Sequence, residues 1–229
     1  MGGDKEKLVI IGDGETAELA YDYFTGDTNY DVVAFSAERN FIRNKTLFGL
    51  PVVPLEEIDK LYPPNSHKAF VAISYTKLNT LRRKLYNLVK EKGYPLCSYV
   101  SPTTFIGKNV EIGENCFIFE NVTLQRGAKI SNNVTIWSGS LVGHRSVIGE
   151  NCFVASHVAI SGFCDVGENC FLGVNSCTAG GLKIGSNCII GAGAVVVKDL
   201  SEGKIYVGNP AKPLPNKTTQ SFVLGNQML

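Results

Sequence analysis

The sequence predicts a mixed chain in which a small α/β unit precedes a parallel β-helix. The main observation is an aliphatic residue at every sixth position from Val100 to Val196, without an insertion. An α-helix has a period of about 3.6 and a strand a period of about 2, so neither selects this spacing. A six-residue repeat is the signature of a parallel β-helix. The residues before the repeat have a different hydrophobic pattern, in which short apolar runs alternate with stretches that predict helices.

The repeat holds through all of its phases. Its aliphatic phase contains a single exception, Thr178, in the series Val100, Ile106, Ile112, Ile118, Leu124, Ile130, Ile136, Val142, Ile148, Val154, Ile160, Val166, Leu172, Thr178, Ile184, Ile190 and Val196. Four positions after each aliphatic residue the side chain is small or apolar, so we expect it to point inward, with Leu182 opposite Thr178 as a local exchange of sizes. Three positions after it stands mostly Asn or Gly, residue types that accept φ > 0 and mark corners. Three hexads per coil give between five and six coils, a prism about 27 Å tall.

The N-terminal third predicts strands at 8–11, at 31–35 and around 70–73, with helices at 18–24 and 77–92. Between the first strand and the first helix lies Gly12-Asp13-Gly14-Glu15-Thr16-Ala17. Such a turn either lets the backbone approach a phosphate or is simply a tight connection. The candidate substrate-binding residues are those of this turn and of the next strand ends: Gly12, Asp13, Gly14, Glu15, Ser36 and Ser74.

Composition excludes several classes of protein. The formal charge of +1 argues against a broad nucleic-acid footprint. No apolar run approaches the ~20 residues of a membrane span, and no secretory signal is recognisable, so we expect a cytoplasmic protein that does not bind membranes. Five of the seven cysteines fall on the small inward phase and no CxxC occurs, so we expect neither disulfides nor a metal. These five are Cys116, Cys152, Cys164, Cys170 and Cys188.

The repeat departs from its own rule around two histidines. Arg145, His157 and Phe163 occupy corner positions where Asn or Gly is usual, and His144 precedes Arg145. A histidine on a rigid corner can accept a proton from an amine or hydroxyl that attacks a thioester. His144 is the first candidate for this base and His157 the second, although each could also be an ordinary exposed corner residue. Trp137 puts a large ring where Gly is usual, and we interpret it as a packing anchor between subunits, with a stacking surface as the alternative.

Several segments together resemble the bacterial nucleotide-sugar acetyltransferases of the sialic acid O-acetyltransferase type, a branch of the hexapeptide acyltransferases. They are the opening at 8–17, the entry Tyr99-Val100-Ser101-Pro102, the hexads, Ile190-Gly191-Ala192-Gly193-Ala194-Val195 and Val207-Gly208-Asn209-Pro210-Ala211-Lys212. The resemblance implies a left-handed β-helix, a Rossmann-like nucleotide-binding unit and a homotrimer with sites between adjacent prisms. The implied domains are 1–97 for the sugar nucleotide, 98–200 for the acyltransferase β-helix and 201–229 for a C-terminal cap and tail.

The resemblance also assigns roles to residues. It carries the base onto His144, in Leu141-Val142-Gly143-His144, and implies acetyl-CoA as cosubstrate along the prism edge. The implied cofactor-binding residues are Gly173, Gly191, Ala192, Gly193 and Lys212. Relatives often have an acidic residue after the histidine to orient the ring, where this chain has Arg145, so either another carboxylate or the backbone must hold the imidazole. Phe153 stands where many relatives have a second histidine. Relatives often carry acidic residues at the end of the second strand that read the nucleotide base, whereas this chain has Phe35-Ser36-Ala37-Glu38, so the recognised base stays open.

The expected function is N-acetylation of an amino group on a nucleotide-linked deoxy sugar, by direct attack on acetyl-CoA. Three alternatives stay open. They are O-acetylation of a free sugar such as a sialic acid, a γ-type carbonic anhydrase, which needs a third histidine for zinc, and a structural prism that mediates assembly.

Overall fold

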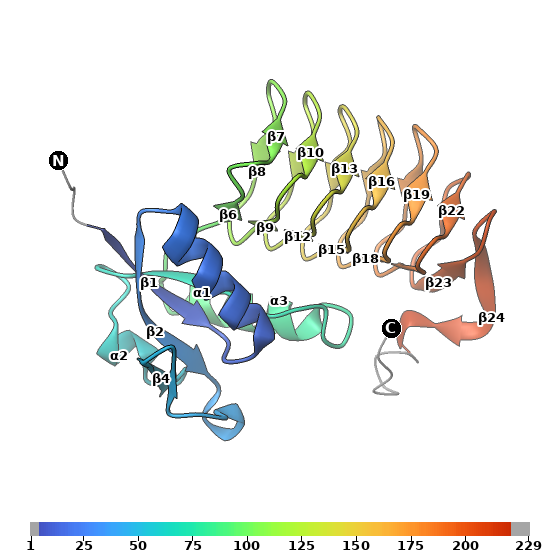
Figure 1. The fold of residues 1–229 in the computed structure, drawn as a ribbon. Helices are drawn as coiled ribbons and strands as arrows, with labels where there is room; N and C mark the ends of the chain where they lie inside the picture. Colours follow the sequence, from blue (N-terminus) through green and yellow to red (C-terminus); the bar gives the residue numbers. More distant parts are fainter. Residues whose placement is uncertain (1–4, 221–229) are drawn as a thin grey trace. The chain divides into compact units, whose positions relative to one another are not determined.

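The computed structural model describes residues 5–220, which form two compact units (Figure 1). The first contains residues 5–74 and 82–99. The second contains residues 75–81 and 100–220, so that a short segment from the N-terminal third belongs to the second unit.

The first unit is built on a mostly parallel sheet with the strand order β3-β4-β2-β1-β5. Its strands are β1 (Glu6–Ile11), β2 (Tyr30–Ala37), β3 (Thr46–Leu47), β4 (Leu50–Pro54) and β5 (Lys68–Val71). Its helices are α1 (Glu15–Asp27), the 3₁₀ turn η1 (Arg39–Phe41), α2 (Ile58–Leu61) and α3 (Thr80–Glu91). Residues 8–11 are fully buried, as expected for a parallel strand covered on both faces. The parallel α/β arrangement is confirmed, while its description as Rossmann-like stays a prediction.

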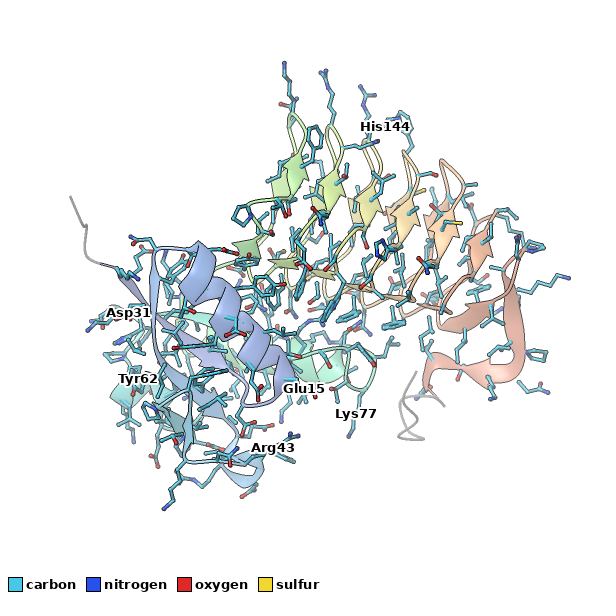
Figure 2. The ribbon with its side chains drawn as sticks, viewed as in Figure 1. Glu15, Asp31, Arg43, Tyr62, Lys77 and His144 are labelled. Carbon is cyan, nitrogen blue, oxygen red and sulfur yellow. The ribbon has the colours of Figure 1, made fainter. Side chains whose placement is uncertain are left out.

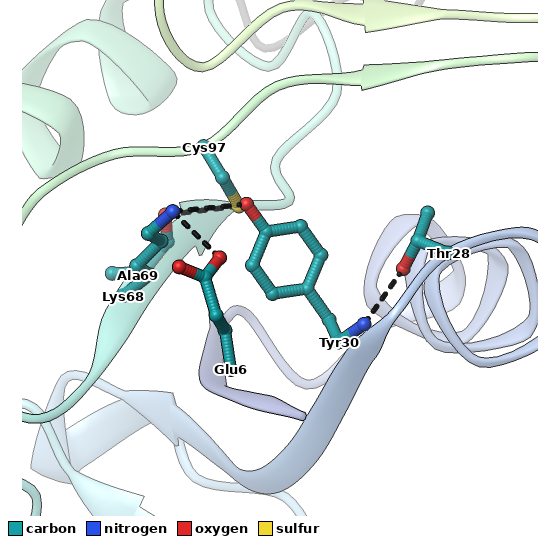
Figure 3. A network of polar contacts seen from close by, with 6 residues as sticks. All are labelled: Glu6, Thr28, Tyr30, Lys68, Ala69 and Cys97. Carbon is teal, nitrogen blue, oxygen red and sulfur yellow. Dashed lines mark hydrogen bonds and ion pairs between the residues drawn. The ribbon is translucent and has the colours of Figure 1, made fainter. Parts of the chain in front are cut away.

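The amino ends of three strands are tied together by one polar network (Figure 3). Lys68 on β5 donates from Nζ to Glu6 Oε2 on β1 at 2.7 Å and to the Tyr30 hydroxyl on β2 at 3.3 Å. The bond to Glu6 raises the pKa of Lys68, and burial raises the pKa of Tyr30. Burial also raises the pKa of the neighbouring Cys97 thiol to about 12. This network lies at the end of the sheet opposite the Gly-rich turn, so its role is to hold strands together.

The second unit is a parallel β-helix of two-residue strands in three sheets. Sheet I stacks β7 (Phe105–Ile106), β10 (Thr123–Leu124), β13 (Leu141–Val142), β16 (Ala159–Ile160), β19 (Cys177–Thr178) and β22 (Val195–Val196). Sheet II stacks β8 (Glu111–Ile112), β11 (Lys129–Ile130), β14 (Val147–Ile148), β17 (Asp165–Val166) and β20 (Lys183–Ile184). Sheet III runs from β6 (Tyr99–Val100) through β9 (Phe117–Ile118), β12 (Thr135–Ile136), β15 (Phe153–Val154), β18 (Phe171–Leu172) and β21 (Ile189–Ile190). Each strand pairs with the strand three hexads further along the chain, for example Thr123 with Leu141, so the predicted coil of three hexads is confirmed.

The aliphatic phase fills the centre of the prism, and most of its members are at most 2% exposed. Ile106, at 50%, is exposed because β7 pairs on one side only. The corner phase has φ between 53° and 73° at every position from Asn109 to Gly193, including Arg145. This left-handed conformation turns the chain at each corner, as the Asn and Gly pattern predicts.

Residues 75–81 pack on the outer face of sheet III. Tyr75 contacts Phe153 and Phe171 with ring centroids 5.0 Å apart in each pair. Asn79, fully buried, donates from Nδ2 to the Cys170 carbonyl at 3.2 Å. Lys77 and the two residues after it have φ near 50–60°, so the predicted helix start at 77 is wrong, and α3 begins at Thr80. Trp137 stacks on Phe119 of the same chain with ring centroids 4.4 Å apart, and its role between subunits stays a prediction.

The end of the prism is extended by β23 (Lys204–Val207), which pairs with β21, and by β24 (Lys212–Thr218), which pairs antiparallel with β23. Tyr206 and Ala211 join the prism core, each 4% exposed. These strands cover part of the last coil, as a cap is expected to do. The question of whether 222–224 docks lies outside the described residues.

Candidate active site

His144 lies in the turn from sheet I to sheet II, directly after β13, and its side chain is exposed (Figure 2). Its imidazole lies over Gly162, which occupies the same place one coil later. A Cβ on Gly162 would come within 2.4 Å of the ring carbon Cε1 and 2.7 Å of Nδ1. The imidazole can therefore occupy this position only because residue 162 has no side chain.

Two further side chains hold His144. Gln125 Oε1 accepts the His144 backbone N–H at 2.9 Å and lies 3.3 Å from Nδ1. The Phe163 ring meets the imidazole edge to face, with centroids 4.8 Å apart. The ring is thus bounded by residues of the coils before and after its own.

Arg145 is engaged elsewhere. Its guanidinium carbon lies 5.7 Å from the centroid of the Phe163 ring, a cation–π arrangement. The imidazole is therefore oriented by a neutral side-chain amide, that of Gln125. Among the described residues, neither of the two expected partners, a carboxylate or a backbone group, hydrogen-bonds to the ring. The sequence signal was available, because Gln125 precedes His144 by about one coil and so falls on the same edge of the prism.

Thr178, the exception in the aliphatic phase, lies beside this position. In the regular ladder Gly143 N–H donates to the Ile160 carbonyl at 2.7 Å. One coil later, Ser161 N–H donates instead to Thr178 Oγ1 at 3.1 Å, and the Ser161 hydroxyl donates to the Thr178 carbonyl at 2.7 Å. The hydroxyl at 178 thus replaces a ladder hydrogen bond immediately before Gly162, which an exchange of sizes with Leu182 does not explain.

The structure does not bring His157 to this place. His157 lies in the turn from sheet III to sheet I, between β15 and β16, whereas His144, Arg145 and Phe163 lie in turns from sheet I to sheet II. Its ring covers Gly139, where a Cβ would be 2.5 Å from the ring Nδ1. His157 therefore lies on a different edge of the prism from His144, Arg145 and Phe163.

The candidate cofactor-binding glycines also lie in turns from sheet III to sheet I. A Cβ on Gly173 would be 2.6 Å from the Ala192 nitrogen, and one on Gly191 would be 2.9 Å from Val207 Cγ1. The stacking of coils therefore requires glycine at 173, whereas the neighbour of Gly191 is a methyl group of the exposed Val207 side chain on β23. Gly193 has an open surface and φ +67, and Lys212 is exposed at the start of β24. Within one prism these residues and His144 are on different edges.

In the first unit, the predicted substrate-binding residues gather at the carboxyl ends of the strands. Gly12 N–H donates to the Ser36 carbonyl at 2.7 Å, and the Ser74 carbonyl accepts from Arg82. Gly12 has φ +134, and a Cβ there would be 2.7 Å from the Ala72 carbonyl oxygen, so glycine is required. Ser36 is fully buried.

The turn is open to an anion at the start of α1. Its N-cap, Gly14, provides no side-chain cap for the first N–H groups of the helix. Asp13 turns its carboxylate away, since Oδ2 accepts the Arg43 backbone N–H at 2.9 Å. Two exposed carboxylates, Glu15 and Glu18, also lie in the first turn of α1. Figure 2 labels Glu15 and Arg43 on this unit.

Within residues 5–220, no three His, Cys, Asp or Glu side chains are grouped as a metal site. In the same described range, no helix has the length and apolar character needed to cross a membrane.

Comparisons with known proteins agree with this architecture. A profile described as the hexapeptide repeat of succinyl-transferase matches residues 103–138 and 165–198, and one described as the bacterial transferase hexapeptide, with six repeats, matches residues 127–162. These repeats are consistent with a left-handed β-helix.

Solved structures match over nearly the whole chain. PerB from Caulobacter crescentus, in complex with CoA and GDP-perosamine, is 29% identical with a TM-score of 0.82, over 91% of this chain and 97% of PerB. WeeI from Acinetobacter baumannii is 26% identical with a TM-score of 0.76, over 90% of this chain and 99% of WeeI. The acetyltransferase domain of PglB from Neisseria gonorrhoeae is 24% identical with a TM-score of 0.83, over 92% of this chain and all of that domain, and this likeness concerns the fold.

The chain therefore contains hexapeptide repeats of the bacterial transferase type and is similar along most of its length to structures of sugar N-acetyltransferases. Two further structures of the Caulobacter perosamine N-acetyltransferase carry a substitution of one histidine, by asparagine in one and by alanine in the other.

Proposed function

We propose that this protein is an acetyl-CoA-dependent N-acetyltransferase that acts on the amino group of a nucleotide-linked amino deoxy sugar. The observation that carries the proposal is the imidazole of His144, seated over Gly162 on an exposed corner of a hexapeptide prism. The full-length likeness to PerB, which binds CoA and GDP-perosamine, supports the substrate class.

His144 acts as general base in this reaction. The amine nitrogen attacks the thioester carbonyl, the C–N bond forms, and His144 accepts the proton that the nitrogen loses. The C–S bond then breaks and coenzyme A leaves as a thiol. We assign the oxyanion contact to the backbone N–H of Gly162, the glycine beneath the ring, and such a contact strengthens as charge develops.

The division of residues between edges supports a homotrimer. His144 is on one edge, and the candidate cofactor residues from Gly173 to Gly193 are on another. A site that uses both sets is completed by a second prism. The turn at Gly12 to Glu15 would bind the sugar nucleotide through the free N–H groups of α1, with Ser36 shaping the turn beneath them.

The decisive experiment compares two histidines. His144→Ala should lower turnover by about 10²–10⁴-fold, the contribution of a general base, while the oligomeric state is unchanged. His157→Asn is the matched control, since His157 is also exposed and Asn suits its corner, and it should keep full activity. Coenzyme A release is followed by chromatography with amine-bearing sugar nucleotides. Full activity of His144→Ala together with loss in His157→Asn would move the base to His157.

A substrate panel tests the chemistry. O-acetylation of a free sugar, as in the sialic acid O-acetyltransferase type, is the second candidate because a histidine base serves a hydroxyl equally well. A free sugar acetylated faster than every amine-bearing sugar nucleotide would favour it. Failure to bind any acyl-CoA would instead favour the third hypothesis, a non-enzymatic prism that mediates assembly.

A further inference from the structure

The amide of Gln125 has a defined orientation toward His144. The backbone N–H of His144 needs an acceptor, and it finds Gln125 Oε1 at 2.9 Å. The oxygen end of the amide therefore faces the histidine, with the NH₂ group turned away. The same oxygen lies 3.3 Å from the ring nitrogen Nδ1.

This orientation selects a tautomer. A carbonyl oxygen only accepts hydrogen bonds, so its contact with Nδ1 requires a hydrogen on Nδ1. A neutral imidazole carries one N–H, and Nε2 is then left with the lone pair. We propose that Gln125 is a positioning residue that holds His144 as the Nδ1–H tautomer and so presents Nε2 as the base; this rests on the proposed function.

The other neighbours of the ring restrict it without choosing between tautomers. Gly162 lies beneath the ring and Phe163 meets it edge to face, and neither offers a side-chain acceptor. Within residues 5–220, the hydrogen bond to the His144 ring is the one between Nδ1 and Gln125 Oε1. A carboxylate in this role would also stabilise the imidazolium by charge. Gln125 supplies the orientation alone.

The test combines kinetics with a direct measurement of the tautomer. Long-range ¹H–¹⁵N NMR spectra of the full chain report which ring nitrogen is protonated, and the His144→Ala spectrum assigns the signals. Gln125→Leu removes the acceptor, so the Nδ1–H population should fall and kcat should drop about tenfold, the effect of one hydrogen bond. Gln125→Glu keeps an acceptor, so it should keep the Nδ1–H tautomer and rescue the kcat that Gln125→Leu loses, with any added effect coming from the new charge.

Asn132→Leu is the matched structural control. Asn132 Oδ1 accepts the backbone N–H of Glu114 at 3.0 Å, the same kind of bridge between coils, on an edge without histidine. This variant should leave tautomer and kcat unchanged. A wild-type His144 protonated at Nε2, a Gln125→Leu variant with an unaltered tautomer, or a Gln125→Glu variant that behaves like Gln125→Leu would each overturn the proposal. A shifted tautomer with undiminished kcat would support the positioning and overturn the base role of His144.

Discussion

A substitution at Gly162 should move the imidazole of His144, the proposed base, and change little else. Alanine there places a methyl group 2.4 Å from His144 Cε1. Carbon atoms in contact lie about 3.5–4.0 Å apart, so the imidazole must shift by about 1 Å or more. A shift of that size breaks the hydrogen bond between His144 Nδ1 and Gln125 Oε1, which are 3.3 Å apart in the structure. A displacement of this size costs about 10²-fold in rate, and we expect that loss of kcat in Gly162→Ala.

The fold should tolerate the change. Gly162 is not among the residues with φ > 0, and the displaced ring is exposed. Replacement of glycine by alanine in a compatible conformation contributes about 0.4–1 kcal/mol of stability through the unfolded chain. Thermal unfolding should therefore occur at or slightly above the wild-type temperature. The variant also keeps the N–H of residue 162, so only the volume of the methyl group is tested.

Steady-state coenzyme A release and a double-mutant cycle provide the assay. If Gly162 acts through the ring, His144→Ala combined with Gly162→Ala should be no slower than His144→Ala alone. Wild-type turnover in Gly162→Ala would refute the reasoning, and so would additive losses in the double variant.

Three more predictions concern the corners and the thiols. Phe163→Asn should raise the unfolding free energy by about 1 kcal/mol, because φ +60 suits Asn, and should lower kcat because His144 loses its ring contact. Asn133→Ala should cost about 2–4 kcal/mol in urea unfolding, because it strains a corner at φ +58 and breaks the buried asparagine ladder on both sides. The Cys97 thiol, with its pKa raised to about 12, should resist alkylation at neutral pH until the chain unfolds. Its folded pKa exceeds the ordinary value of 9.0, so its contribution to stability is complete below pH 9 and is lost as the pH rises toward 12.

Each of these predictions has a contrary result. Lower stability in Phe163→Asn would show that aromatic contacts outweigh corner strain. Asn133→Gly loses the same ladder hydrogen bonds but is not strained at φ +58, so equal losses in the Ala and Gly variants would assign the whole effect to the ladder. Alkylation of Cys97 in the folded protein, detected by mass spectrometry, would contradict its burial.

The sequence predicted the prism because one repeat controls core, corners and register together. Arg145 and Phe163 were recognised as unusual corners, and their separation of three hexads, one full coil, indicates one edge. His157 is only two hexads from Arg145, so counting in coils would have placed it on another edge. Gln125 was missed because no hexad phase marks it. The start of α3 was missed because buried packing of Asn79 overrides the helical propensity of the segment from Lys77.

Because each coil contains three hexads, the position of a residue in the sequence fixes both the edge of the prism and the coil on which it lies. Loss of one hexad would leave the apolar centre intact yet turn every later residue to a neighbouring edge. Loss of three hexads would shorten the β-helix by one coil and leave every later residue on its original edge. Differences in length between such proteins should therefore be whole coils of three hexads, or loops inserted at the corners.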